Sequence, residues 1–577
     1  MVTIEPKLLR RSAQSTQLPE SLDPLLRQIY ANRGITSDSQ LERSLKGLLH
    51  YQSLTGIDTA IELLIDALKR QLKIVIVGDF DADGATSTAL AIKVMRQMGY
   101  QQVSYHIPNR FDDGYGLSPQ VVHDVAKKGA ELIITVDNGI SSFEGVDVAH
   151  EYGIRVLVTD HHLPGQSLPA ADAIINPNLD DCAFLSKSLA GVGVTFYLMT
   201  ALRAKLEKQG WFEQQKLKRP NMADFLDLVA LGTVADVVPL DENNRIFVYE
   251  GLRRVRAGHC CAGIKALTEV SRKELSQLVS SDFGFSLGPR LNAAGRLDDM
   301  SVGVALLLTD DIGTAREIAN ELDGLNQTRR EIEAGMQEEA STIFRQFMGT
   351  QHDLPNGLAI YHPEWHQGVV GILASRIKEK LHRPVIAFAP SGDGLLKGSG
   401  RSIHGVHLRD ALERLNTLNP GLMVKFGGHA MAAGLSLEED KFTLFQQHFS
   451  SLMAELVSKE QLQGVILSDG ELTDSQLTLP TAEMLREAGP WGQAFPEPLF
   501  DGKFQLLKPR IVGEKHLKMI LQPLNSNLLI DAIAFNIDRN VWPDNSIKMV
   551  EIAYRLDINE FRGQRNPQLL VEHIWPC

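Results

Sequence analysis

Hydrophobic and polar positions alternate regularly between residues 72 and 160. Short, continuous apolar runs are separated by stretches with the spacing of amphipathic helices. The expected elements are strand 73–79, helix 85–98, strand 102–108, a helix opening at Ser118 and Pro119, strand 131–137, helix 142–152 and strand 155–160. Buried strands that alternate with helices predict an α/β fold with a doubly wound parallel sheet.

Aspartates stand at the ends of three of these four predicted strands. Asp79, Asp137 and Asp160 each follow directly on an apolar run. Ligands of such sheets bind beyond the carboxyl ends of the strands, so the three carboxylates are expected at one edge. Asp81 and Asp83 extend the first group, because alternate side chains of an extended segment point the same way. The group predicts a cation site; the alternative is a set of solvated turn aspartates that cap the following helix.

Two further segments add candidate ligands. His161 and His162 follow Asp160, and Asp236 ends the apolar run 228–236. A carboxylate at the end of such a run is costly to bury unless it is paired or bound to a metal. The structural alternatives are histidines that pack or face solvent, and an aspartate in a turn or at a helix C-terminus.

The second half of the chain has a different pattern. Residues 310–346 are charged and helix-forming, which predicts a long helix that joins two lobes. After about residue 460, short alternating runs predict a small antiparallel β-barrel. Lysines and arginines near Phe504 and Phe561 fit a nucleic-acid-binding barrel, although an ordinary strand surface with core aromatics explains each of them equally well.

Composition narrows the class of protein. The 577 residues are 44% apolar and 22% charged, which predicts three or four globular domains. The net charge of −13 argues against a uniformly basic surface, so any nucleic-acid site is expected to be local. The longest apolar stretch, 188–202, falls short of the ~20 residues of a membrane span. The four cysteines lack paired spacing, and no secretory signal or Walker A loop is visible, so a cytoplasmic protein without ATP-driven action is expected.

Eight short motifs resemble one known family. In chain order, DFDADG (79–84), VDNG (136–139), DHH (160–162) and GTVAD (232–236) resemble the four motifs of the DHH phosphoesterase superfamily. GPRLNAAGR (288–296), EWHQGVVGILASRI (364–377), GSGRS (398–402) and GGHAMAAG (427–434) are similar to the branch that carries a DHHA1 domain and contains single-strand-specific 5′→3′ DNA exonucleases. The resemblance covers roughly residues 45–577.

The resemblance implies a domain order. It comprises an N-terminal extension (1–45), a DHH phosphoesterase domain with the doubly wound sheet (46–300), a connecting helix (301–348), an α/β DHHA1 domain (349–458) and a C-terminal OB-like β-barrel that binds nucleic acid (459–577).

The candidate ligands favour particular metals. Carboxylates with an imidazole and no thiolate favour Mg²⁺ or Mn²⁺. The resemblance implies two ions per active site, bridged by Asp137, with Asp83, His161 and Asp236 on one ion and Asp79 with Asp81 on the other. Two ions about 3.5–4 Å apart can hold the attacking and leaving oxygens of a phosphoryl displacement. His162 would contact phosphate, and Asp160 would orient the histidines.

The resemblance also implies phosphate-binding residues. Arg110, Ser399 and Arg401 would form a pocket for the 5′-terminal phosphate. Further contacts to DNA are expected from Arg290, Asn292, Arg296 and His429. The glycine-rich motifs around Ser399 and His429 have the simpler alternative of glycine turns between strands.

The resulting hypothesis is a metal-dependent exonuclease that degrades single-stranded DNA 5′→3′ to 5′-mononucleotides by two-metal hydrolysis, in recombination and repair. Its catalytic residues would be Asp81, Asp83, Asp137, His161, His162 and Asp236. A phosphodiesterase for short oligonucleotides or cyclic dinucleotides is the first alternative, and a DNA-binding scaffold with an inactive site is the second. The resemblance suggests a monomer that works with a single-stranded-DNA-binding protein and a RecQ-type helicase.

Overall fold

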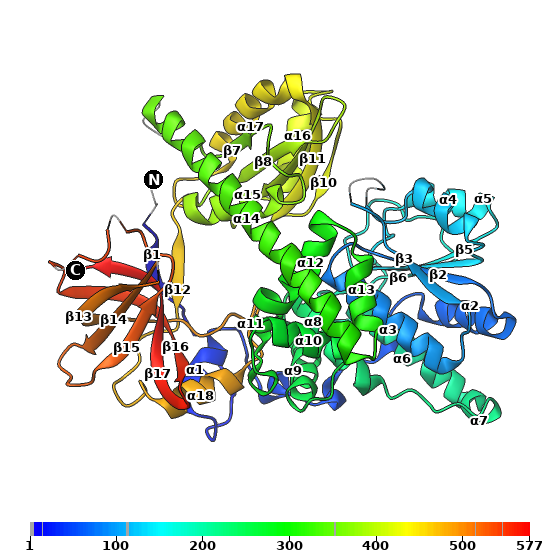
Figure 1. Cartoon of the computed structure of the whole chain (residues 1–577), viewed down its shortest axis with the longest axis horizontal. Helices are drawn as coiled ribbons and strands as arrows, with labels where there is room; N and C mark the ends of the chain where they lie inside the picture. Colours follow the sequence, from blue (N-terminus) through cyan, green and yellow to red (C-terminus); the bar gives the residue numbers. More distant parts are fainter. Residues whose placement is uncertain are drawn as a thin grey trace. The chain divides into compact units, whose positions relative to one another are not determined.

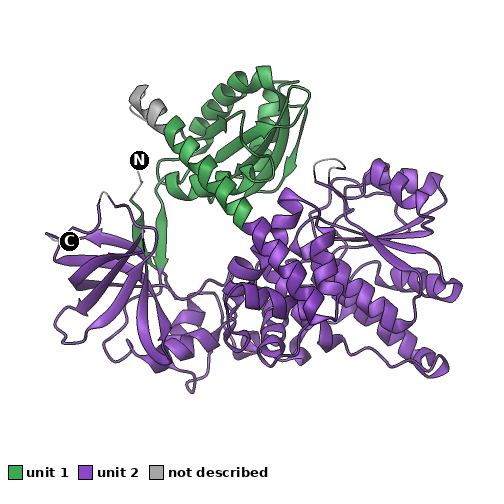
Figure 2. Ribbon diagram, in the orientation of Figure 1, with its two compact units in different colours: residues 1–10, 327–467 green, residues 11–326, 468–577 purple. Residues whose placement is uncertain are grey.

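The computed structural model describes residues 5–13, 15–110, 113, 115–350, 354–513, 515–539, 541–544 and 546–577. The chain divides into two compact units, which Figure 2 distinguishes by colour. The larger unit contains residues 11–326 and 468–577, and the smaller unit contains residues 1–10 and 327–467. Among the described residues, no helix combines the length and the apolar character that crossing a bilayer requires.

A five-stranded parallel sheet forms one part of the larger unit. Its strand order is β3-β2-β4-β5-β6, and all its pairs are parallel (Figure 1). The strands are β2 (Ile74–Gly78), β3 (Val103–His106), β4 (Leu132–Val136), β5 (Arg155–Thr159) and β6 (Ala173–Ile175). The connecting helices are α2 (Ile57–Arg70), α3 (Ala82–Met98), α4 (Pro119–Lys127), α5 (Phe143–Glu151) and α6 (Gly191–Lys208). The predicted doubly wound sheet is confirmed.

Both faces of this sheet are buried, which explains the continuous apolar runs. Along β2, Val75 and Val77 pack with α4 and α5 on one face. Ile74 and Ile76 point to the other face, where α2, α3 and α6 cover the sheet. Because side chains alternate between two covered faces, the strand has no polar positions.

Helices extend the larger unit beyond the sheet. They are α7 (Trp211–Gln214), α8 (Leu226–Ala235), α9 (Glu242–Arg256), α10 (Ala262–Val270), α11 (Ser280–Asp282), α12 (Gly288–Leu297) and α13 (Ser301–Leu308). α8 packs against α3, α6 and α9, so it is almost entirely buried. The N-terminal helix α1 (Pro24–Ala31) is tied to the C-terminal part of the same unit, because Arg33 forms a buried ion pair with Asp469.

The C-terminal part of the larger unit contains α18 (Leu479–Ala488) and a closed five-stranded barrel. The barrel order is β13-β14-β15-β17-β16, formed by β13 (Phe500–Val512), β14 (His516–Pro523), β15 (Ile530–Ala534), β16 (Met549–Phe561) and β17 (Gln564–Pro576). The barrel was expected to be antiparallel, and this is wrong for one pair, since β15 and β17 run parallel where the sheet closes. Phe504 lies in the barrel core, whereas Phe561 is 65% exposed.

The smaller unit is built on a mixed sheet. Its order is β10-β11-β9-β8-β7, in which only the pair of β7 and β8 is parallel. The elements are β7 (Leu358–Tyr361), α15 (Val370–Leu381), β8 (Val385–Pro390), β9 (Leu395–Arg401), α16 (Leu408–Leu418), β10 (Lys425–Gly428), β11 (Ala432–Glu438) and α17 (Phe442–Leu456). The short strands β1 (Lys7–Arg10) and β12 (Val465–Ser468) form a separate two-stranded sheet.

The predicted long helix is α14, which covers Ile312–Thr350. It does not continue back to residue 301, because the chain between Thr309 and Asp311 leaves the helical conformation. Asp311 then accepts a hydrogen bond from the Thr314 N–H and so caps the new helix. The domain boundaries given above stay predictions.

Candidate metal centre and phosphate-binding residues

The carboxyl ends of three neighbouring strands place three aspartates at one edge of the parallel sheet. Asp79 follows β2, Asp137 follows β4 and Asp160 follows β5, and all three side chains are buried. The Asp137 N–H donates to the Thr159 carbonyl, which continues the ladder by one residue beyond the strands. The predicted gathering of these carboxylates is confirmed.

Asp81 and Asp83 reach the edge in a different way from the one expected. α3 begins at Ala82 rather than at residue 85, and Asp81 is its N-cap, with Oδ1 accepting from the N–H groups of Asp83 and Gly84 at 2.9 and 3.0 Å. Asp83 therefore stands in the first helical turn, and the prediction that Asp81 and Asp83 continue an extended segment is wrong. The capping alternative holds for Asp81, but Asp79 and Asp83 are buried rather than solvated.

Backbone groups at the start of α6 hold Asp83. Its two carboxylate oxygens accept from the N–H groups of Gly191 and Val192 at 2.6 and 2.9 Å. A helix N-terminus favours an anion in this way. A Cβ on residue 191 would lie 2.6 Å from the Cβ of Asp137, so only glycine allows this approach. The sequence motifs gave no signal for these two donors.

Asp160 orients the histidines, as predicted from the resemblance. Its carboxylate accepts from the backbone N–H groups of Ile140, His161 and His162 and pairs with His162 Nδ1 at 2.7 Å. Burial opposes ionisation of Asp160, but the hydrogen bond from His162 and the other donors outweigh it and lower the pKa of Asp160 to about 2. Burial likewise opposes protonation of His162, but Asp160 outweighs it and raises the pKa of His162 to about 9.

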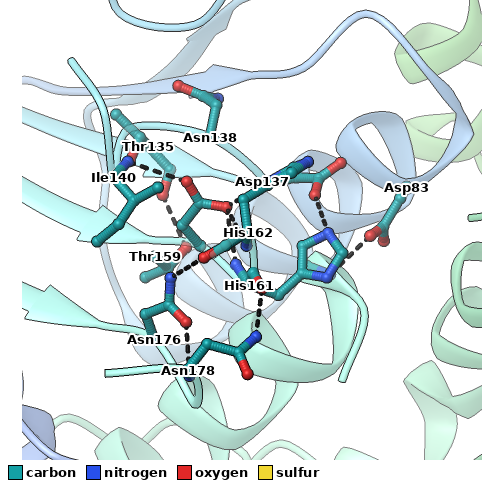
Figure 3. A network of polar contacts seen from close by, with 12 residues as sticks. Asp83, Thr135, Asp137, Asn138, Ile140, Thr159, His161, His162, Asn176 and Asn178 are labelled. Atoms are coloured by element: carbon teal, nitrogen blue, oxygen red, sulfur yellow. Dashed lines mark hydrogen bonds and ion pairs between the residues drawn. The ribbon is translucent and has the colours of Figure 1, made fainter. Parts of the chain in front are cut away.

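Two asparagines fix the backbone of the same histidines. Asn176 Nδ2 donates to the His162 carbonyl at 2.8 Å, and Asn178 Nδ2 donates to the His161 carbonyl at 2.6 Å. Figure 3 shows these contacts and the His161 ring between Asp137 and Asp83. Both asparagines follow β6, and no motif in the sequence pointed to them.

His161 joins the carboxylates into groups that could hold metal ions. Its Nε2 lies 3.0 Å from Asp137 Oδ1 and 3.5 Å from Asp236 Oδ2. Within each of three groups the ligand atoms lie within 4.8 Å of one another: Asp79 with Asp81 and Asp137, Asp83 with His161 and Asp236, and Asp137 with His161 and His162. Asp236 caps the C-terminus of α8, as the structural alternative for the run 228–236 predicts, and it is paired with His161. Metal binding by Asp236 stays a prediction.

The electrostatics of these groups suit cations. Burial, followed by the neighbouring carboxylates, raises the pKa of Asp79 to about 8 and that of Asp83 to about 7. The same causes raise the pKa values of Asp137 and Asp236 well above the ordinary range. Asp79 Oδ1, Asp137 Oδ1 and Asp236 Oδ2 are buried and accept no well-directed hydrogen bond from the described residues, although the last two lie within ion-pair distance of His161 Nε2. Divalent cations would satisfy these oxygens, so the donor set fits Mg²⁺ or Mn²⁺.

Arg110 lies beside the carboxylates. Its guanidinium stacks 3.9 Å from the centre of the Phe80 ring, and Nε donates to the Gly295 carbonyl at 3.0 Å. Burial lowers the pKa of Arg110, while Asp79 and Asp81 act in the opposite direction. Arg110 is therefore held within the electrostatic field of Asp79 and Asp81, two of the candidate metal ligands.

Helix α12 carries three of the other predicted phosphate contacts. Arg290 is buried and pairs with Asp323 at 2.8 Å, and it also donates to the Ser286 carbonyl. Asn292 Oδ1 accepts from the Ala82 N–H at 2.7 Å, which supports the start of α3. Arg296 lies in the last turn of α12. The Asn292 contact positions α12 against the Asp79–Asp83 segment, and the DNA contacts of all three residues stay predictions.

Ser399, Arg401 and His429 belong to the smaller unit. Arg401 Nη1 donates to Ser399 Oγ at 3.2 Å and to the Gly400 carbonyl at 2.8 Å, and burial lowers its pKa. Both residues lie within β9, so the alternative of a glycine turn between strands is wrong for that motif. His429 does lie in the turn between β10 and β11.

Glycine also makes room beside Arg401. Gly371 is in the first turn of α15, and a Cβ there would lie 2.9 Å from Ser399 Oγ and 3.1 Å from Arg401 Nη2. The two polar side chains therefore pack directly against the helix N-terminus, where an anion is favoured.

Family models match three parts of the chain. The N-terminal domain of the DHH family matches residues 73–233, the DHHA1 domain matches residues 355–455, and the RecJ OB domain matches residues 468–573. The parallel sheet with its carboxylate edge, the mixed sheet and the closed barrel thus define a DHH phosphoesterase with DHHA1 and OB domains.

Comparison with whole proteins narrows this class. The chain is 66% identical to the single-stranded-DNA-specific exonuclease RecJ of Dickeya dadantii and 62% identical to that of Escherichia coli, over 99% of both sequences in each case. The chain belongs to the RecJ family. The crystal structure of RecJ in complex with Mn²⁺ from Thermus thermophilus superposes with a TM-score of 0.78 at 28% identity, covering 99% of this chain and 79% of that one. The Mg²⁺ complex from the same organism gives a TM-score of 0.73 at 27% identity, covering 98% and 78%.

Proposed function

We propose that this chain is a metal-dependent exonuclease that degrades single-stranded DNA 5′→3′ to 5′-mononucleotides by two-metal phosphodiester hydrolysis, in DNA recombination and repair. The observation that carries the proposal is the buried group of aspartates with His161 at the edge of the parallel sheet. The full-length relatives named as single-stranded-DNA-specific exonucleases support the choice of substrate.

Two sets of ligands are assigned within the metal-ligand cluster. Asp83, His161 and Asp236 would hold one Mg²⁺ or Mn²⁺ ion, and Asp79 with Asp81 would hold the other. Asp137 would bridge them, because it belongs to the group of Asp79 and Asp81 and also lies 3.0 Å from His161. Such a pair of ions, when bound, activates water and stabilises charge on the departing oxygen. The buried oxygens without a hydrogen bond from the described residues support this assignment.

His162 would serve as a cationic contact to phosphate. Its Nδ1 side pairs with Asp160, and the raised pKa keeps the ring protonated at neutral pH. Nε2, which lies 3.4 Å from the Tyr115 hydroxyl, can then donate to a phosphate oxygen. Asp160 acts through His162 as a positioning residue.

The remaining cations would bind the strand. Arg401 and Ser399 would grip the 5′-terminal phosphate, since Arg401 donates only to neutral acceptors in the contacts given above and can pair with an anion. Arg110 would contact phosphate beside the metal-ligand cluster, and Arg290, Asn292, Arg296 and His429 would contact the rest of the strand. Binding of the 5′-terminal phosphate would set both the 5′→3′ polarity of degradation and the removal of one nucleotide at a time.

The partners beyond DNA come from the resemblance alone. We propose a monomer in the cytoplasm that works with a single-stranded-DNA-binding protein and a RecQ-type helicase. Sedimentation of the purified protein tests the oligomeric state, and binding assays with the two purified partners test the interactions.

Degradation of end-labelled DNA tests the function. With Mn²⁺, the protein should release 5′-mononucleotides from a 5′-phosphorylated single strand, and it should be inactive with a chelator. Blunt duplex DNA should be a poor substrate, because only an unpaired strand can be drawn stepwise across the metal-ligand cluster. Equal rates on single strands and blunt duplexes would contradict the single-strand assignment, and activity restricted to dinucleotides would favour the small-substrate phosphodiesterase.

A further inference from the structure

A cavity of about 560 Å³ lies within the larger unit, beside the end of α8. Its walls come from the residues after α8, from α11 and the π-helical turn Phe283–Leu287, and from α18, the loop after it and β16. Val234 and Val237 line it, and in the chain they flank Asp236 of the metal-ligand cluster. Val237 thus links the cavity lining to Asp236 along the chain, while the described lining contains none of the side chains of the metal-ligand cluster.

Val237 has an unusual conformation. Its φ is 62°, and its N–H donates to the Val234 carbonyl as the chain leaves α8. Glycine or asparagine normally takes this left-handed position, and a β-branched residue there is strained. The side chain is nevertheless 62% exposed, so burial does not offset the strain. Strained residues of this kind are found mainly at functional sites.

Phe285 lines the same cavity from a second irregular element. The π-helical turn keeps Phe283 and Leu287 fully buried while Phe285 between them is 80% exposed. The turn packs beside α8, since a Cβ on Gly284 would lie 3.4 Å from Val234 Cγ1, an ordinary contact distance. π-turns occur frequently at functional sites. Two local irregularities thus present apolar side chains to one cavity.

The charges of the lining argue against a phosphate ligand. Each cation has a carboxylate partner: Lys273 with Asp282 at 2.8 Å, Arg486 with Asp557 at 2.8 Å and Arg555 with Glu497 at 3.1 Å. A neutral, planar ligand suits the exposed phenyl ring better. Gln277 and Gln493 also line the cavity, and their amides can both donate to and accept from the edge of a nucleobase.

We propose that Phe285 and Val237 hold a nucleobase of the substrate strand, stacked on the Phe285 ring, at a fixed number of nucleotides from the phosphodiester at the metal-ligand cluster. The inference rests on the proposed function and adds a base-binding site to it. The substrate class favours this occupant over a protein segment, because Val237 of the cavity lining directly follows Asp236 of the metal-ligand cluster in the chain. Stacking is tolerant of sequence, so any base can occupy the site.

Fluorescence of 2-aminopurine in bound DNA tests the proposal without catalysis. The base analogue is placed at successive positions of a 5′-phosphorylated single strand and bound to the full-length protein in chelator. Wild-type protein should quench the fluorescence of the analogue at one position more strongly than the free strand does. Phe285→Ala should lose that quenching and bind about tenfold more weakly, and Phe285→Trp should retain it. Phe143→Ala, which removes a 37% exposed ring on α5, is the matched control and should behave as wild type.

Val237→Gly provides an independent variant. Glycine relieves the left-handed strain, so the protein should melt at the same temperature or higher while quenching weakens at the same position. Unchanged profiles for Phe285→Ala would overturn the proposal and leave the cavity to another occupant such as a protein segment. An equal loss of quenching at every position of the base analogue would also overturn the proposal. If wild-type protein does not hydrolyse single strands with Mn²⁺, the proposed function itself fails, whereas hydrolysis with unchanged profiles rejects only this site.

Discussion

Replacing Asp137 with asparagine separates catalysis from stability at the metal-ligand cluster. Asp137 is buried, lies 3.0 Å from His161 and has a φ of 64°. Asparagine keeps the shape of the side chain and tolerates the left-handed conformation, in which alanine would be strained. The substitution therefore removes a charge without adding backbone strain.

Asp137→Asn should lower turnover but raise the stability of the metal-free protein. Turnover should fall more than about 100-fold, since losing a residue that only orients a metal ligand already costs about 10–100-fold. In metal-free protein the carboxyl groups with raised pKa values bind protons more tightly when folded than when unfolded. Stability is therefore lost as pH rises from about 4 to about 8, the pKa of Asp79. The loss is at most about 1.4 kcal/mol per pH unit for each such group. Replacing Asp137 with asparagine removes one of these carboxyl groups and its repulsion of the neighbouring carboxylates.

Thermal unfolding and turnover measure these effects. In chelator at pH 8, Asp137→Asn should melt at a higher temperature than wild type, and the difference should shrink at pH 6. Mn²⁺ should raise the midpoint of wild type more than that of the variant. Asp310→Asn, which removes an exposed charge from the same unit, is the control. A lower midpoint of Asp137→Asn in chelator at pH 8, or turnover near that of wild type, would refute the reasoning.

Three further predictions concern the phosphate contacts. Arg401→Ala should slow hydrolysis of 5′-phosphorylated DNA about tenfold more than that of 5′-hydroxyl DNA under single-turnover conditions; an equal fall would reject the terminal-phosphate role. Gly371→Ala should shift the same ratio in the same direction, since its Cβ would displace Ser399 and Arg401, and an unchanged ratio counts against the packing argument. Asp160→Asn should lower the pKa of His162 from about 9 towards its ordinary value, so activity should be lost at lower pH than in wild type, and overlapping pH–rate profiles would remove His162 as the cationic contact.

The edge of the parallel sheet could be predicted because its signals are local. Strands buried on both faces leave continuous apolar runs, and a parallel sheet brings their carboxyl ends together. Asp79, Asp137 and Asp160 were therefore placed correctly without any knowledge of contacts. The metal ligation and the DNA contacts assigned to individual residues are still predictions.

Errors arose where helix ends compete with extended chain. A period-2 pattern predicted Asp81 and Asp83 on one face of an extended segment, but Asp81 caps α3 and Asp83 is the second residue of this helix. The run ending in Asp236 was assigned to neither helix nor strand, because a short apolar run does not distinguish them, and it forms the buried helix α8. In the barrel, the alternating pattern around Phe504 is compatible with a core or a surface position. The closed sheet shows that Phe504 lies in the core.

Contacts between residues distant in sequence could not be predicted from the sequence. Asn176 and Asn178 hold the histidine backbone, and Gly191 holds Asp83 from 108 positions away. No spacing in the chain encodes such pairs. Glycines next to apolar residues at 191 and 232 were the available signal, because a glycine inside a helix often marks a close approach to another group.

Close approach explains why those glycines surround the carboxylates. A Cβ at Gly232 would lie 2.9 Å from Asp83 Oδ1, and one at Gly191 would lie 2.7 Å from Asp137 Oδ1. Helix α6 can then bring its backbone donors to Asp83 at hydrogen-bond distance. These donors stabilise the Asp83 anion but supply no counter-charge, so the burial and the carboxylate repulsion that raise the pKa values of Asp137 and Asp236 persist. Helix packing thus holds the carboxylates together without compensating their charge, and divalent cations are the ligands that this arrangement favours.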